Sequence, residues 1–206
     1  MRIRRLLLAA IATAALAAPA AAAQGDWQMR LRGIGVLPEA SGTVTVGGVP
    51  LPGKIHVTDT IVPEVDFTYF FADHWAAELI AATNQHSVHQ TTAGDIGSVW
   101  LLPPTLTVQY HFYPEGNIRP YVGGGINYTF FYSPRSPLPG IHYDSNFGWA
   151  VQAGVDVPFG NSRYFFNADV KKLFLSTDVT ALGGVVRAKG ADLDPWIIGV
   201  GVGYRF

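Results

Sequence analysis

The chain has 206 residues, a formal net charge of −1, no cysteine and only 14% charged residues beside 49% hydrophobic ones. The length fits one domain, and the absence of cysteine excludes a disulfide framework. So low a charged fraction is unusual for a soluble protein, in which about a quarter of the residues are charged.

The N-terminus predicts a cleavable signal peptide. Arg2, Arg4 and Arg5 form a cationic region, and an apolar stretch of thirteen residues follows at 6–18. The small residues at 21–23 suit signal peptidase, which predicts cleavage before Gln24. The alternative, a membrane anchor, needs an apolar run of about 20 residues. We therefore expect a signal peptide at 1–23 and one domain at 24–206.

The predicted mature chain keeps 11 Lys and Arg against 15 Asp and Glu, because the signal carries three of the basic residues. This net charge of −4 argues against nucleic acid as a partner, since no basic patch is left to neutralise phosphates. After the signal, no apolar run reaches the roughly 18 residues of a spanning helix. An exported, apolar chain of this kind predicts a transmembrane β-barrel, whose lipid-facing residues stand at alternate positions.

Eight segments alternate between apolar and polar residues with the period of two that indicates β-strands. The clearest is the fourth, where Leu106, Val108 and Tyr110 alternate with Thr107 and Gln109. Long and short gaps alternate between the segments, which predicts an eight-stranded antiparallel up-and-down barrel with short periplasmic turns. The expected strands are 27–37, 61–70, 75–83, 104–112, 119–130, 147–157, 164–173 and 196–206.

Alternation does not say which face points inward, and a soluble barrel would bury the apolar face. Two features favour the membrane. Aromatic residues gather at strand ends, as the girdles of a membrane barrel require. The other face carries charges and glycines, which suit a polar lumen better than a soluble core. The terminal Tyr204 and Phe206 also resemble the sorting signal that the barrel-assembly machinery reads, so we expect an integral outer-membrane protein.

Nine ionisable residues fall on the predicted lumen face of the lower barrel. An eight-stranded barrel is just wide enough for side chains to fill it, and unpaired ions there would cost several kcal/mol each. We therefore expect a charged plug, and the alternative is a set of charges solvated in an open lumen. The residues are Arg30, Arg32, Glu64, Asp66, Glu78, Asp156, Asp169, Lys171 and Arg205.

Above the plug, inward glycines such as Gly125 and Gly201 are expected to leave space beneath an apolar outer mouth. An apolar mouth over a polar plug predicts a blind pocket for a small hydrophobic ligand. The ligand would leave sideways where Pro103 and Pro104 weaken strand pairing, unless these prolines merely end a loop. The expected mouth residues are Trp100, Leu101, Leu102, Phe131, Tyr143 and Phe147.

Catalysis and metal binding have only weak signals. His86, Ser87 and His89 lie in a predicted outer loop, and Asp95 is the nearest acid that could orient a base. Two histidines three residues apart, without cysteine or a Glu-bearing helix, are a weak zinc pattern. We expect no enzyme activity, no metal site and no cofactor.

Several short motifs together resemble the outer membrane protein W (OmpW) family over nearly all of the mature chain. The resemblance implies a monomeric eight-stranded barrel in a Gram-negative outer membrane, with a narrow hydrophobic path for small apolar molecules. Trp100, Leu101 and Phe147 depart from the family pattern. The alternative is a non-transporting receptor barrel whose outer loops bind a phage, a bacteriocin or a host surface. The motifs are at 79–83, 94–96, 102–106, 119–123, 125–128, 154–156, 167–170, 193–196 and 203–206.

Overall fold

The computed structural model describes residues 24–206, so the predicted signal peptide lies outside the described residues. Eight long strands form the body of the molecule, and their bounds agree with the predicted segments to within a few residues at most ends. No helix in the described part of the chain is long and apolar enough to cross a membrane. The strands are β1 (Trp27–Leu37), β5 (Thr60–Ala72), β6 (Trp75–Ala82), β9 (Thr105–His111), β10 (Arg119–Arg135), β12 (Asn146–Pro158), β13 (Tyr164–Phe174) and β16 (Trp196–Arg205).

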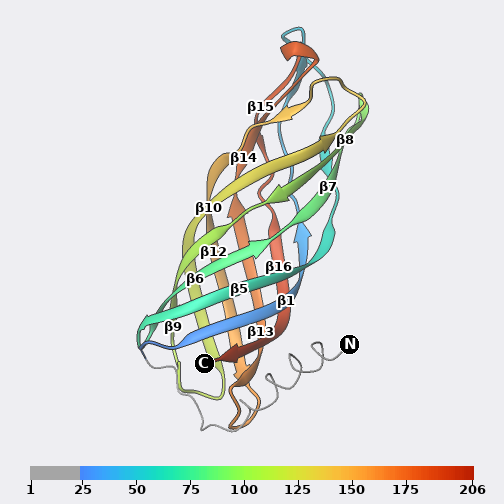
Figure 1. Cartoon of the computed structure of the whole chain (residues 1–206). Coiled ribbons are helices and arrows are strands. Elements are labelled where there is room, and N and C mark those ends of the chain that lie inside the picture. Colours follow the sequence, from blue (N-terminus) through green and yellow to red (C-terminus); the bar gives the residue numbers. More distant parts are fainter. Residues whose placement is uncertain (1–23) are drawn as a thin grey trace, which may run out of the picture.

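The eight strands close into an antiparallel barrel. Consecutive strands pair around the ring, and the first strand, β1, pairs with the last, β16. Arg30 on β1, for example, lies opposite Gly203 on β16 and Asp66 on β5. The beginning of β1 and the C-terminus lie together at the lower end of the barrel, beside the short turns (Figure 1). The predicted eight-stranded up-and-down fold is confirmed.

The upper end is more ordered than the sequence predicts. The segment at 84–103, predicted as a long loop, is instead a hairpin of β7 (Asn84–Gln90) and β8 (Gly94–Leu102) that continues the wall above β6 and β9 (Figure 1). The predicted loops at 38–60, 131–146 and 174–195 also hold strands. These are β2 (Val44–Val46), β3 (Val49–Pro50), β4 (Ile55–Val57), β11 (His142–Tyr143), β14 (Ser176–Ala181) and β15 (Val186–Asp192), with a 3-10 turn at Leu182–Gly184.

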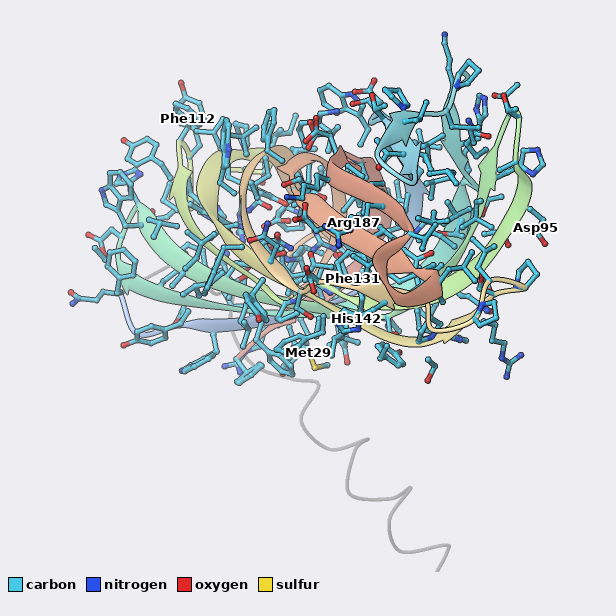
Figure 2. The ribbon with its side chains drawn as sticks, turned by 90° about the horizontal axis from the view of Figure 1, so that it is seen from above. Met29, Asp95, Phe112, Phe131, His142 and Arg187 are labelled. Atoms are coloured by element: carbon cyan, nitrogen blue, oxygen red, sulfur yellow. The ribbon has the colours of Figure 1, made fainter. Side chains whose placement is uncertain are left out.

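The two faces of the wall are those expected of a membrane barrel. On β1, Met29 and Leu31 point outward and are about half exposed, whereas Gln28, Arg30 and Arg32 point inward and are buried. The same alternation runs around the ring, so the outer surface is apolar and the lower lumen is polar. In Figure 2, seen from above, Met29 and Phe112 lie on the outside of the wall.

Aromatic rings form two girdles on the outer surface. In the lower girdle Trp75 packs against Tyr110, with ring centroids 5.1 Å apart. In the upper girdle Trp149 stacks on Phe174 at 3.9 Å. Such belts mark the two membrane–water interfaces. The apolar band between them identifies the part of the wall that faces lipid.

Candidate functional site

A network of ion pairs fills the lower lumen. Its centre is Arg30, whose guanidinium lies 2.8 Å from carboxylate oxygens of both Asp66 and Glu78 and 3.6 Å from Asp156. Arg30 also donates hydrogen bonds to the hydroxyls of Thr68 and Tyr121. The Arg30 side chain is fully buried, so its charge is balanced by these partners rather than by water.

A second cation, Arg32, extends the network upward. Its guanidinium lies 2.9 Å from Asp66 and 3.4 Å from Asp169, and it also pairs with Glu64. Above it, Lys171 lies 2.9 Å from Asp169. We call the eight connected residues the lumen charge cluster. They are Arg30, Arg32, Glu64, Asp66, Glu78, Asp156, Asp169 and Lys171.

The ninth predicted plug residue, Arg205, lies one layer lower. It is buried at the level of Gln28, and its guanidinium carbon is 5.2 Å from the centre of the Phe70 ring. The structure thus places all nine predicted residues inside the lower barrel. The packed charges and rings leave the lower lumen filled.

A layer of aliphatic side chains covers the charge cluster. Ile34, Leu173 and Ile197 are all nearly fully buried and pack together across the lumen. Above this layer the interior opens into a single large space that we call the upper cavity. Its lining residues are Val36, Pro38, Val44, Ile55, Val57, Asn84, His86, Val88, Gln90, Ile96, Val99, Leu101, Pro103, Phe131, Leu138, Ile141, Tyr143, Leu173, Leu175, Thr177, Val179, Ala181, Val186, Ala188, Ala191, Leu193, Pro195 and Ile197.

The upper cavity is apolar and opens to solvent. Its empty space is about 1100 Å³, part of it open to solvent. Three of the predicted mouth residues, Leu101, Phe131 and Tyr143, line it. The rings of Phe131 and Tyr143 stack with centroids 5.7 Å apart, and Phe131 lies near the centre of the ring of strands in Figure 2.

The other three predicted mouth residues do not line the cavity, and the prediction was wrong for them. Trp100 and Leu102 flank Leu101 on β8, and neighbouring residues of a strand point to opposite faces. Trp100 therefore stacks on Tyr132 of the outer surface, with centroids 6.2 Å apart. Phe147 is 67% exposed, and its ring lies 4.6 Å from Tyr128 in the upper girdle.

The inward glycines do not create the cavity, contrary to expectation. A Cβ on Gly201 would lie 2.1 Å from the carbonyl oxygen of Leu31 and 2.8 Å from the Arg32 side chain. A Cβ on Gly125 would lie 2.0 Å from the carbonyl oxygen of Leu106. The room that these glycines leave is therefore taken by neighbouring strands and by the stem of Arg32.

Much of the cavity wall comes from segments that the sequence indicated only as loops. Ile55 on β4, Val179 on β14 and Ala188 on β15 all contribute apolar surface. These strands are short and pair with distant partners, as β4 does with β7. Their alternation is too brief to predict, although the small and β-branched residues at 176–191 are a weak signal of strands.

Two polar side chains stand in the apolar wall contributed by β7. Asn84 and His86 share the inward face of this strand and are both nearly fully buried. Nδ1 of His86 lies 2.6 Å from the backbone carbonyl oxygen of Thr58. A carbonyl only accepts hydrogen bonds, so Nδ1 carries the proton and Nε2 of the neutral ring is an acceptor. Burial lowers the pKa of His86, against the opposing effects of that hydrogen bond and of Asp59.

We expect the stability of the upper barrel to fall in mild acid because of His86. Its folded-state pKa lies below the unfolded value of about 6.5, so the folded protein binds this proton more weakly. The part of the folding stability that depends on a neutral His86 is fully present above about pH 6.5. It is lost as the pH falls through the folded-state pKa. Urea unfolding in micelles at pH 7.5 and 5.5 measures it, and a His86→Gln variant should lose less stability between the two. If the wild type and His86→Gln lose the same stability between pH 7.5 and pH 5.5, His86 is not the group responsible.

The histidines and the serine of β7 do not share one face of the strand. His86 points inward, whereas Ser87 and His89 are exposed. The carboxylate of Asp95 accepts a hydrogen bond from the backbone N–H of Gly97 in its own turn. Within residues 24–206 no group of three or more His, Cys, Asp or Glu side chains could hold a metal ion. His89 lies opposite Asp95 across the β7–β8 hairpin, but in the described residues no side-chain hydrogen bond joins His89 to Ser87 or to Asp95.

The wall is interrupted where the barrel meets its upper extension. β6 pairs with β9 as far as Ile80 and Thr105, and pairing resumes between Asn84 on β7 and Leu101 on β8. Pro103 and Pro104, which have no N–H to donate, lie in the interruption, and Pro103 lines the cavity. The Thr83 hydroxyl donates to the carbonyl oxygen of Leu101 and is 2.5 Å from the Tyr132 hydroxyl.

Comparison with known proteins agrees with this architecture. The family model described as "OmpW family" matches residues 23–206, which include every described residue. The chain belongs to the OmpW family. The "Uncharacterized outer-membrane protein y4mB" of Sinorhizobium fredii is 44% identical over 90% of this chain and 82% of that protein. "Outer membrane protein W" of Escherichia coli K12 is 34% identical over 98% and 100%.

A solved outer-membrane protein structure is similar to this chain over nearly the full length of both proteins. The crystal structure of the outer membrane protein OprG from Pseudomonas aeruginosa matches with a TM-score of 0.83 at 28% identity, covering 89% of this chain and 97% of OprG. These similarities agree with the apolar outer surface between the two aromatic girdles. The protein is therefore an integral barrel of a Gram-negative outer membrane.

Proposed function

We propose that the protein binds small apolar molecules in the upper cavity and passes them into the membrane without changing them chemically. The observation that carries this proposal is an almost wholly apolar cavity that is partly open to solvent and is closed below by aliphatic side chains and the lumen charge cluster. A concave, mostly apolar site with a few polar groups is the kind that binds small ligands. The filled lower lumen denies such a ligand a straight path to the periplasm.

The interruption at Pro103 and Pro104 supplies the exit in this proposal. It lies at the cavity wall, beside the upper aromatic girdle, where a ligand leaving sideways would meet lipid rather than water. An apolar molecule gains free energy on that step because it stays out of water. Among residues 24–206 the Thr83 hydroxyl bridges the gap by donating to the carbonyl oxygen of Leu101, so in this proposal little hydrogen bonding has to break.

A vesicle assay tests the proposal. Proteoliposomes with lipopolysaccharide in the outer leaflet are mixed with an apolar dye that fluoresces in the acyl layer. We expect Phe131→Arg to slow dye uptake by about tenfold or more, because a cation in the apolar cavity costs at least the 1.4 kcal/mol that a factor of ten represents. Phe147→Arg is the matched control, since an arginine at the girdle reaches the interface at little cost.

The outcomes separate the alternatives. Uptake that is lost with Phe131→Arg and kept with Phe147→Arg supports the cavity as the route. Uptake equal in wild type and Phe131→Arg, or no greater than in empty vesicles, contradicts the proposal and leaves the barrel a receptor or structural protein.

We also infer how the barrel is assembled in the membrane and what its oligomeric state is. Tyr204 and Phe206 lie in the lower girdle, where their rings stack with centroids 6.2 Å apart. Both are at the free end of β16, accessible before the barrel closes, which suits recognition by the barrel-assembly machinery. We infer that the finished barrel is a monomer, because its strands leave no open edge in the ring.

A further inference from the structure

Asn84 is an unpartnered amide in the apolar cavity. Its side chain is only 6% exposed, and it lines the cavity. The carbonyl oxygen Oδ1 is completely buried, and no group within residues 24–206 hydrogen-bonds to it. A buried amide left without partners costs free energy, so most such groups in folded proteins are paired. Asn84 therefore brings an amide without a partner in the described residues to the wall of the cavity.

Two other polar side chains of the wall, Gln90 and Thr177, have partners within the chain. The Gln90 amide donates to the carbonyl oxygen of Pro52 and accepts from the backbone N–H groups of Thr92 and Ala93. The Thr177 hydroxyl donates to the carbonyl oxygen of Asp144. Asn84 differs from both, so its free oxygen is not a general property of the cavity.

Asn84 also lies at a distinctive place in the cavity. It is the first residue of β7, opposite Leu101 and directly beside the interruption at Pro103 and Pro104. His86 follows two residues later on the same face, with Nε2 left as an acceptor by the hydrogen bond at Nδ1. Two residues of a strand span about 7 Å, so both groups can meet one small ligand.

We propose that the cavity selects apolar molecules that carry a hydroxyl group, alcohols or phenols, and that the Asn84 amide hydrogen-bonds this hydroxyl at the membrane end of the cavity. The proposal rests on the function proposed above and names its ligand class. A hydroxyl can accept from the Asn84 amide nitrogen, which a hydrocarbon would leave without a partner, and a rotation of the amide would bring Oδ1 to face the hydroxyl proton. A site built to hydrogen-bond a hydroxyl discriminates strongly against the analogue that lacks it.

Naphthalene and 1-naphthol are suitable probes because they differ by one hydroxyl. Binding to the protein in lipid nanodiscs is measured by equilibrium dialysis at pH 7.5, and uptake by empty nanodiscs is subtracted. We expect the wild type to bind 1-naphthol about tenfold more tightly than naphthalene, and Asn84→Leu to bind the two within about twofold. Gln85→Leu removes an outward amide from the same strand and should keep the wild-type preference.

A stability measurement distinguishes recognition from a structural role. Leucine matches asparagine in shape and leaves no unpaired polar atom, so Asn84→Leu should unfold in urea at the wild-type midpoint or above it. A structural asparagine would instead lower the midpoint. If leucine prevents folding, Asn84→Ala serves as the second variant, with the same expected loss of the hydroxyl preference.

The possible results bear separately on the two proposals. Equal binding of both probes by wild type, or an unchanged preference in Asn84→Leu, overturns the hydroxyl proposal and leaves the apolar cavity intact. Binding of neither probe above empty nanodiscs overturns both. A preference that is lost in Asn84→Leu and kept in Gln85→Leu supports both.

Discussion

Arg30→Met is expected to lower the free energy of unfolding by about 3–5 kcal/mol, the cost of removing one partner from a buried ion pair. Arg30 lies within 3.6 Å of three carboxylates, and methionine would leave these carboxylates with one cation fewer to balance them. Urea titration of the protein in micelles measures the change. The folded fraction is read from the different gel mobilities of the closed and unfolded barrel.

The matched control is Arg135→Met, which removes an exposed arginine at the upper end of β10. It should change stability by less than about 0.5 kcal/mol, as surface substitutions usually do. Adding Glu78→Gln to Arg30→Met should recover part of the loss, because one uncompensated charge is then removed. An unchanged midpoint in Arg30→Met would show that water enters the lower lumen and screens these charges.

Gly201→Ala should destabilise the barrel by about 1–3 kcal/mol, the usual cost of overpacking. The added methyl would lie 2.1 Å from the carbonyl oxygen of Leu31 and 2.8 Å from the Arg32 side chain. The backbone of β1 would have to move, and the Arg32 contacts with Glu64 and Asp66 would move with it. The same urea titration measures the loss.

Gly33 supplies the comparison, because it lies next to Arg32 but points outward. A Cβ there would meet nothing within 4 Å. Gly33→Ala should therefore be neutral or stabilise the barrel by about 0.4–1 kcal/mol, since alanine restricts the unfolded chain. Equal effects of the two substitutions would contradict the close approach of β1 and β16 at Gly201.

The lower barrel could be predicted from the sequence because its signal is periodic and chemically unambiguous. Residues such as Leu106 and Thr107 alternate over a whole strand, and a charge such as Arg30 on the polar phase has only the lumen to occupy. The structure places all nine predicted lumen charges there. The strand period thus determined both the fold and the position of each charge.

The upper cavity could not be predicted in the same way. Its walls come from short strands such as β4 and β15, which depend on pairing with distant segments. The mouth prediction grouped Trp100 with Leu101 by proximity in sequence, although a strand sends neighbours to opposite faces. Phe147 was placed at the mouth although it continues the outward phase of Trp149. Asn84 carried no signal in the sequence, because only the closed cavity shows that its amide has no partner.

The lumen charge cluster has a consequence for the order of assembly. Its members come from strands near both ends of the chain, from Arg30 on β1 to Lys171 on β13, and β16 must lie between those two strands. A partly inserted sheet would therefore carry unbalanced ions at its seam in contact with lipid. Neutralisation is completed only when β16 docks on β1. Insertion and closure are thereby coupled into one cooperative step. A half-closed barrel is unfavourable because it exposes unbalanced charges to lipid.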